Sequence, residues 1–183
     1  MFYEDKSTVP AGYKYSRKEA FLAMGNLNAA FQRMTQEPKS KQKDLREVYE
    51  IVSLLQEMLF SAASLGSFIK THHITRASVH FTNLVSAIQA NLSHSVDILE
   101  DQPTGEEFDP EKVADAHAYF KNMLKELVEK RQLEVSDKGE EDPILPQRTQ
   151  EAQLVMDQLM WLLEISGNLK ELVKKVYSKK ESV

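Results

Sequence analysis

Apolar side chains recur every three or four positions along most of this 183-residue chain, the spacing of one face of an α-helix. The clearest stripe lies in residues 76–99 and consists of Phe81, Leu84, Val85, Ile88, Leu92, Val96 and Leu99. Comparable stripes lie in residues 17–36, 41–71 and 147–178, and in a segment that begins at Pro110. The pattern predicts an all-α fold, a single antiparallel bundle of about five long helices.

Local signals predict where the first helix begins and ends. Ser16 and Glu19 form a capping-box pattern, so we expect this helix to start near Arg17. Pro38 disfavours the α region at Glu37, and we expect the helix to stop there. Glu37 and Pro38 therefore mark a structural junction between the first two helices.

A second set of signals concerns the chain after residue 100. Asp109 followed by Pro110 predicts the start of the fourth helix, because aspartate caps helices and proline suits the first helical position. Residues 134–146, EVSDKGEEDPILP, are acidic and contain two prolines, which predicts a mobile loop. Residues 154–163 are apolar on more than one side, which predicts a central last helix.

Gly66 lies inside the second half of the predicted second helix, within a stretch of small side chains. A glycine inside a helix destabilises it by up to about 1 kcal/mol relative to alanine. We therefore expect Gly66 to serve packing, by allowing another part of the chain to approach closely.

Composition excludes several classes of protein. The net charge of -5 argues against nucleic-acid binding by the chain as a whole. The absence of cysteine excludes disulfides, cysteine-ligated zinc and a cysteine nucleophile. No uninterrupted apolar run approaches the roughly 20 residues of a membrane span, so we expect the chain as given to be soluble.

Candidate chemistry is sparse. His72, His73 and His80 lie close together, but they lack the i, i+4 spacing and the nearby carboxylate of a helical zinc site. We interpret them as helix-end or surface residues, and interpret the isolated His94 and His117 in the same way. No phosphate-binding glycine loop or nucleophile motif occurs, so we expect no enzymatic activity, no metal and no cofactor. The methionines at stripe positions are interpreted as core filler.

Basic residues gather at three places: Lys14, Arg17 and Lys18, then residues 39–46, then residues 174–180. Solvated surface explains such clusters in most soluble proteins. The alternative is a polarised domain, in which Lys14, Arg17 and Lys18 face an anionic membrane surface.

Residues 13–43 resemble the fusaric acid resistance protein-like family (FUSC, YccS-type) of bacterial inner-membrane proteins. The resemblance is carried by the basic R-K-x-A element at residues 17–20 and by an M-x-x-E-P helix end at residues 34–38. It extends through Leu54-Leu55 and the segment SAASLG at residues 61–66, and covers residues 13–100 approximately.

The resemblance implies a non-catalytic cytoplasmic domain of an inner-membrane transporter or efflux protein, which supports assembly or gating of the membrane part. Residues 1–15 would be a juxtamembrane lead-in with an added Met1, and residues 16–183 the helical domain. The expected partners are the membrane-spanning part of the same protein, anionic lipid headgroups and further copies of the full-length protein. The alternatives are a free-standing ligand-binding bundle with a methionine-lined closed cavity, and a scaffold that docks a partner protein through an exposed apolar patch.

Overall fold

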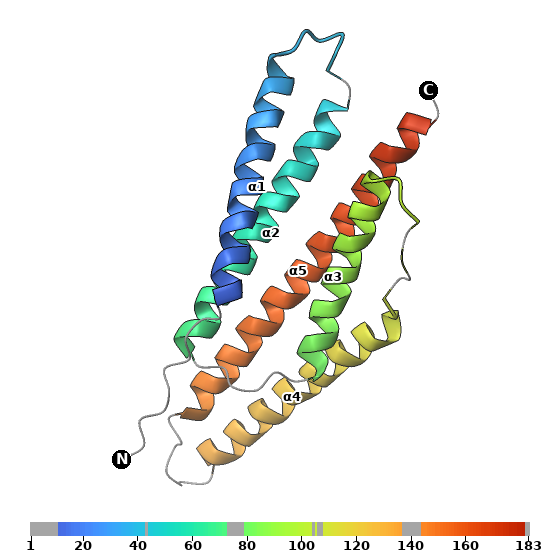
Figure 1. Ribbon diagram of the computed structural model, residues 1–183. Helices are drawn as coiled ribbons and strands as arrows, with labels where there is room; N and C mark the ends of the chain where they lie inside the picture. The colour runs from blue at the N-terminus through green and yellow to red at the C-terminus, as the bar shows by residue number, and fades with distance from the viewer. Residues whose placement is uncertain are drawn as a thin grey trace.

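The computed structural model describes residues 11–42, 44–72, 79–103, 105, 108–136 and 144–181. In these ranges the chain forms helices and no strand, and consecutive helices alternate in direction (Figure 1). The helices are α1 (Ala11–Gln36), α2 (Leu45–His72), α3 (Val79–Leu99), α4 (Pro110–Ser136) and α5 (Ile144–Glu181). The prediction of an all-α bundle of five long helices is confirmed.

Helix α5 holds the bundle together. It contacts α2, α3 and α4, whereas α1 contacts α2 alone among the described helices. Ser61 of α2 donates a hydrogen bond to Gln158 of α5, and Asn91 of α3 donates one to Ser166 of α5. The predicted central position of the last helix is therefore confirmed, although Trp161 on this helix remains 42% exposed.

The core lies where α2, α3, α4 and α5 meet. Its buried members are Leu65, Leu84, Ile88, Ala116, Val155, Leu159 and Leu162. Met58, Met156 and Met160 pack against this cluster, which confirms for these three residues that methionine fills the core. No residue of α1 belongs to the cluster, so α1 is an addition to a four-helix core.

The start of α1 differs from the prediction. The helix begins at Ala11, so Ser16 lies inside its second turn and the capping-box interpretation was wrong. Pro10 precedes Ala11 directly in the sequence, and proline is well tolerated at a helix start. The expected lead-in of residues 1–15 is therefore helical from residue 11, and residues 1–10 lie outside the described residues.

The junction between α1 and α2 is a short turn. Helix α1 ends at Gln36, just before Glu37 and Pro38, as the helix-stop prediction requires. The Gln42 side-chain amide donates hydrogen bonds to the carbonyls of Thr35 at 2.9 Å and Glu37 at 2.7 Å. These bonds satisfy acceptors that a helix end leaves without partners.

Helix α2 begins at Leu45 rather than near residue 41 as predicted. The Lys41 N–H donates to the Pro38 carbonyl at 2.8 Å, which closes a turn in place of a helical start. Asp44 adopts a φ of 51°, and its carbonyl accepts the Val48 N–H at 2.9 Å. The left-handed backbone at Asp44 thus separates the turn from the helix.

The connection from α3 to α4 uses two aspartates. Asp101 has a φ of 56°, and the N–H of Gln102 donates back to the Asp97 carbonyl at 2.8 Å, which is a Schellman-type helix end. Asp109 accepts the Glu111 N–H through Oδ1 at 2.9 Å, so the predicted cap of α4 is confirmed.

Both ends of the predicted loop at residues 134–146 are helical. Residues 134–136 complete α4, and residues 144–146 form the first turn of α5. Pro146 falls in that first turn, where its missing N–H has no intrahelical partner to lose. Residues 137–143 lie outside the described residues, as does His73.

Candidate functional site

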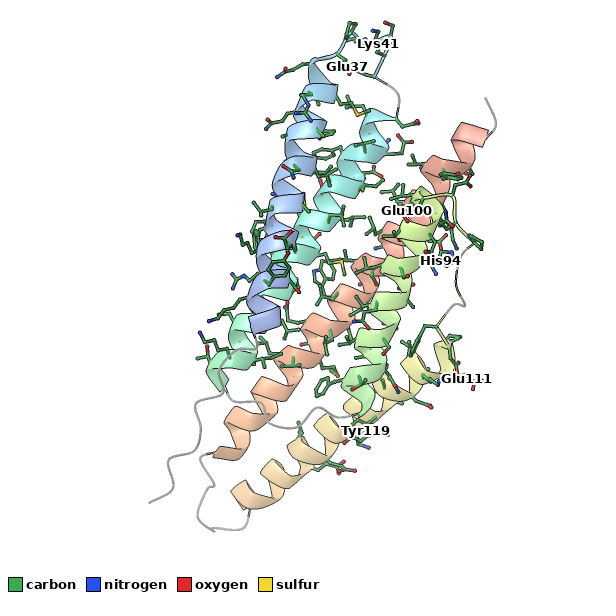
Figure 2. The ribbon with its side chains drawn as sticks, viewed as in Figure 1. Glu37, Lys41, His94, Glu100, Glu111 and Tyr119 are labelled. Atoms are coloured by element: carbon green, nitrogen blue, oxygen red, sulfur yellow. The ribbon has the colours of Figure 1, made fainter. Side chains whose placement is uncertain are left out.

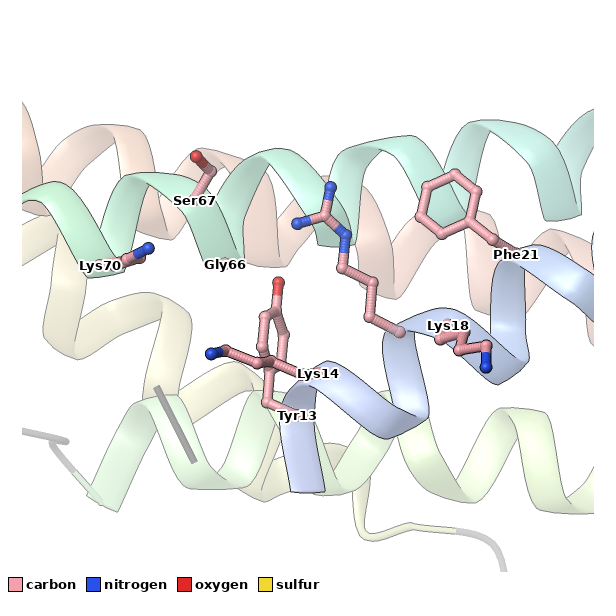
Figure 3. A pocket seen from close by; sticks show the side chains of 8 residues that line it. Tyr13, Lys14, Lys18, Phe21, Gly66, Ser67 and Lys70 are labelled. Atoms are coloured by element: carbon pink, nitrogen blue, oxygen red, sulfur yellow. The ribbon is translucent and has the colours of Figure 1, made fainter. Parts of the chain in front are cut away.

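The first turns of α1 and the last turns of α2 line a pocket of about 560 Å³ that is open to solvent (Figure 3). The antiparallel pairing of the two helices brings these distant segments together (Figure 1). The lining residues are Tyr13, Lys14, Arg17, Lys18 and Phe21 from α1, and Gly66, Ser67 and Lys70 from α2. All three basic residues singled out in the sequence, Lys14, Arg17 and Lys18, thus line one pocket.

Tyr13 and Gly66 form the floor of this pocket. The Tyr13 ring points at Gly66, and a Cβ added at Gly66 would collide with the Tyr13 hydroxyl (Figure 3). That hydroxyl is buried and has no hydrogen-bond partner among the described residues. Gly66 therefore makes room for a side chain of α1, and this contact sets how closely the two helices approach at the pocket.

Aromatic rings lie beside the arginine of the pocket. The Arg17 guanidinium carbon lies 5.7 Å from the centroid of the Phe21 ring, within the range of a cation–π interaction. The Phe21 ring in turn meets the Phe60 ring of α2 edge-on, with centroids 6.1 Å apart. The Arg17 guanidinium therefore lies beside an aromatic pair that joins α1 to α2.

The pocket is strongly basic. Lys14, Arg17, Lys18 and Lys70 contribute four positive charges, and none of them forms an ion pair with a carboxylate among the described residues. Figure 3 shows the ammonium groups of Lys14 and Lys70 on the same side of the Tyr13 ring. Such a concentration of cations attracts anions, despite the net charge of -5 for the chain.

Sequence reasoning missed Lys70, Ser67 and Tyr13 as members of this site. Lys70 lies more than fifty positions from Lys14, so the two meet only through the α1–α2 register. The one signal in the sequence was Gly66, which pointed to a close approach. Glu37 and the nearby Lys41 lie at the opposite end of the hairpin (Figure 2), so the predicted junction at Glu37 and Pro38 is separate from the site.

Two further hollows bear on the alternative functions. One of about 300 Å³ lies between α3, α4 and α5, and is lined by Asn91, His94, Phe108 and Lys170 among others, without methionine. The other, of about 510 Å³, lies between α2 and α5 beside Tyr49 and Leu54. Both are open to solvent and differ from the closed methionine-lined cavity that a sensor would need.

The histidines form no common site in the described part of the chain. His94 borders the hollow between α3 and α5, and His117 is exposed on α4. No group of three or more metal-ligating side chains comes together among the described residues. The side chains of His72 and His80 lie outside the described part.

One described helix, α2, is long and apolar enough to cross a membrane by length and composition, over Leu45–Thr71. Its most apolar window has a mean hydropathy of 1.4, and only 11% of that window is buried. Polar residues interrupt every apolar run in this segment, so the sequence shows no uninterrupted span there. A single such helix is weak support for a span, since core helices of soluble proteins meet the same criteria.

Comparison with known proteins adds no relative: no protein-family model, no curated protein and no solved structure matches this chain.

Proposed function

We propose that this chain is a non-catalytic cytoplasmic domain of a FUSC-like bacterial inner-membrane protein, and that it supports assembly or gating of the membrane-spanning part. One observation carries the proposal. Lys14, Arg17 and Lys18, which flank and include the R-K-x-A element of the resemblance, gather with Lys70 at one end of the α1–α2 hairpin.

The position of these charges suits a domain that meets a membrane at this end. Each basic residue near an anionic leaflet contributes about 1 kcal/mol of attraction. The cluster comes from two helices that pack together, so the whole hairpin end would be drawn to the headgroups. Lys39 and Lys41 in the turn at the far end would then face away from the bilayer (Figure 2).

The architecture suits a mechanical role. Among the described helices α1 contacts α2 alone, whereas α2 joins the core through α5. A displacement at the membrane-facing end of α1 would therefore reach the core through one helix. Through this path the domain could transmit a movement of the membrane part to its own core, or resist that movement.

The direct test is to locate the protein expressed from its native gene. We expect it in the inner-membrane fraction, with a tag at its C-terminus cleaved by protease only after the cells are opened. A tagged product found in the soluble fraction as a chain of 20.9 kDa would overturn the proposal.

A second test addresses the mechanical role in the full-length protein. Pro38→Ala removes the helix stop between α1 and α2, and should lower the oligomer size or the export activity. His94→Ala and His117→Ala serve as controls, and both should leave export near the wild-type level. Loss of export in a histidine variant at a normal protein level would indicate chemistry that contradicts the proposal.

A further inference from the structure

We propose that the pocket between α1 and α2 is a binding site for a phosphate group, carried either by a phospholipid headgroup or by a small phosphate compound. The inference deepens the proposed function. Only binding of a lipid headgroup rests on that function, and binding of a small phosphate compound does not. The geometry adds Lys70 of α2 to the basic residues of α1 as a ligand-binding residue.

The first argument concerns charge along α1. The positive end of the helix dipole lies at its start, yet the first turn contains no acidic residue. Lys14 is spaced three residues from Arg17 and four from Lys18, so like charges lie next to one another on the helix surface. A bound anion would offset the repulsion between the basic residues and the positive helix end, and also the repulsion among the basic residues themselves.

The second argument is the opposing wall. Lys70 adds a fourth cation from α2, and Ser67 also lines this wall, with its hydroxyl directed away from Tyr13 (Figure 3). The contact between Tyr13 and Gly66 holds the two walls together below the charges. The pocket is thus a cleft with cations on both sides rather than a stripe on one exposed helix face.

The third argument selects phosphate among anions. A guanidinium presents paired N–H donors that match two phosphate oxygens, and the Arg17 guanidinium lines the pocket beside the Phe21 ring. A small phosphate monoester carries up to two negative charges and so neutralises more of the four cations than a carboxylate does, whereas the phosphodiester of a phospholipid headgroup carries one. A pocket of about 560 Å³ also has room for the glycerol or sugar to which a phosphate is attached.

The test compares two variants that remove equal charge. Arg17→Gln/Lys70→Gln alters the pocket, whereas Lys39→Gln/Lys41→Gln alters the opposite end of the hairpin. Inorganic phosphate is titrated at constant ionic strength against chloride, and binding is followed by backbone amide NMR shifts. We expect shifts around residues 13–18 and 66–70 in the wild type and the control, and at least about tenfold weaker binding in the pocket variant.

Equal weakening in both variants, or no phosphate effect beyond that of chloride, would overturn the site. Circular dichroism of each variant verifies that it is folded.

A second arm separates the two sources of phosphate. Phosphatidylcholine vesicles with and without phosphatidylglycerol are floated with the same variants. Binding to the anionic vesicles that is lost only in the pocket variant identifies a lipid headgroup, and phosphate binding without vesicle binding identifies a small phosphate compound.

The membrane fractionation described above distinguishes failure of the site from failure of the proposed function. A membrane-located protein that binds no phosphate overturns the site alone. A soluble protein that binds phosphate overturns the proposed function alone.

Discussion

Asn91 of α3 donates a hydrogen bond from Nδ2 to Oγ of Ser166 of α5, at 3.0 Å. Ser166 is 0% exposed, and its hydroxyl donates in turn to the Leu163 carbonyl at 2.8 Å. The Asn91 carbonyl accepts the Ser95 hydroxyl at 2.8 Å. A side-chain hydrogen bond thus joins α3 to α5, and each of its two residues is also hydrogen-bonded within its own helix.

The first prediction tests this hydrogen bond. Asn91→Ala should lower the free energy of unfolding by about 1–2 kcal/mol, because a buried hydroxyl loses a donor and the interface loses contacts. Ser166→Ala should lower it by about 0.5–1.5 kcal/mol, and the double variant should lose less than the sum. Urea unfolding measures all three, with Ser93→Ala on the exposed face of α3 as a neutral control. Strict additivity would show that the bond does not couple the helices.

The second prediction compares two glycines. A Cβ at Gly25 meets nothing within 4 Å, so Gly25→Ala should stabilise the chain by about 0.5–1 kcal/mol through helix propensity. Gly66→Ala should fail to stabilise it, because the new methyl group would displace Tyr13. Thermal unfolding measures both changes. In a Tyr13→Ala background, Gly66→Ala should become stabilising, and the same failure there would rule out the steric explanation.

The third prediction concerns the cap of α4. Asp109→Ala removes the acceptor of the Glu111 N–H, and should lower the free energy of unfolding by about 0.5–2 kcal/mol. Asp115→Ala removes an exposed aspartate from the same helix without a cap, and should change stability by less than about 0.5 kcal/mol. Chemical denaturation followed by circular dichroism measures the difference. Equal effects would mean that the Asp109 contact contributes nothing beyond its charge.

The fourth prediction concerns Asp101, whose φ of 56° is one that glycine adopts more readily. Asp101→Gly should raise the free energy of unfolding by up to about 1 kcal/mol, because the left-handed strain is relieved. Glu100→Gly, one position earlier and at the helix end, has no such strain to relieve and should be destabilising. Differential scanning calorimetry distinguishes the two, and a lower melting temperature for Asp101→Gly would contradict the prediction.

Helical periodicity predicted where the helices lie, because apolar burial along one face is a local property of the sequence. The stripe in residues 76–99 contains Leu84 and Ile88, and both are buried. The start of α1 was mispredicted because Ser16 satisfies the capping pattern, but nothing between Ala11 and Ser16 prevents the helix from starting earlier. A cap residue permits a helix start without requiring one.

Only the α1 side of the pocket could be predicted from the sequence. Lys14, Arg17 and Lys18 are neighbours in sequence, so their grouping is visible in the sequence. Lys70 and Ser67 join them only because α1 pairs antiparallel with α2 in one register, a long-range property that depends on Tyr13 fitting against Gly66. The solvent-exposed face of α5 could not be predicted either. Residues 154–163 are apolar on more than one side, yet Trp161 among them is half-exposed.

The central position of α5 has a consequence for synthesis on the ribosome. Val155, Leu159 and Leu162 of this helix are core members, and they are translated after every other helix. Until they emerge, Leu65, Leu84 and Ile88 lack the surface that covers them in the folded domain. The nascent chain must therefore carry the apolar faces of α2 and α3 without their cover from α5 until residues 155–162 have left the exit tunnel. Chaperone dependence should accordingly be greatest for chains arrested before residues 155–162 have left the exit tunnel.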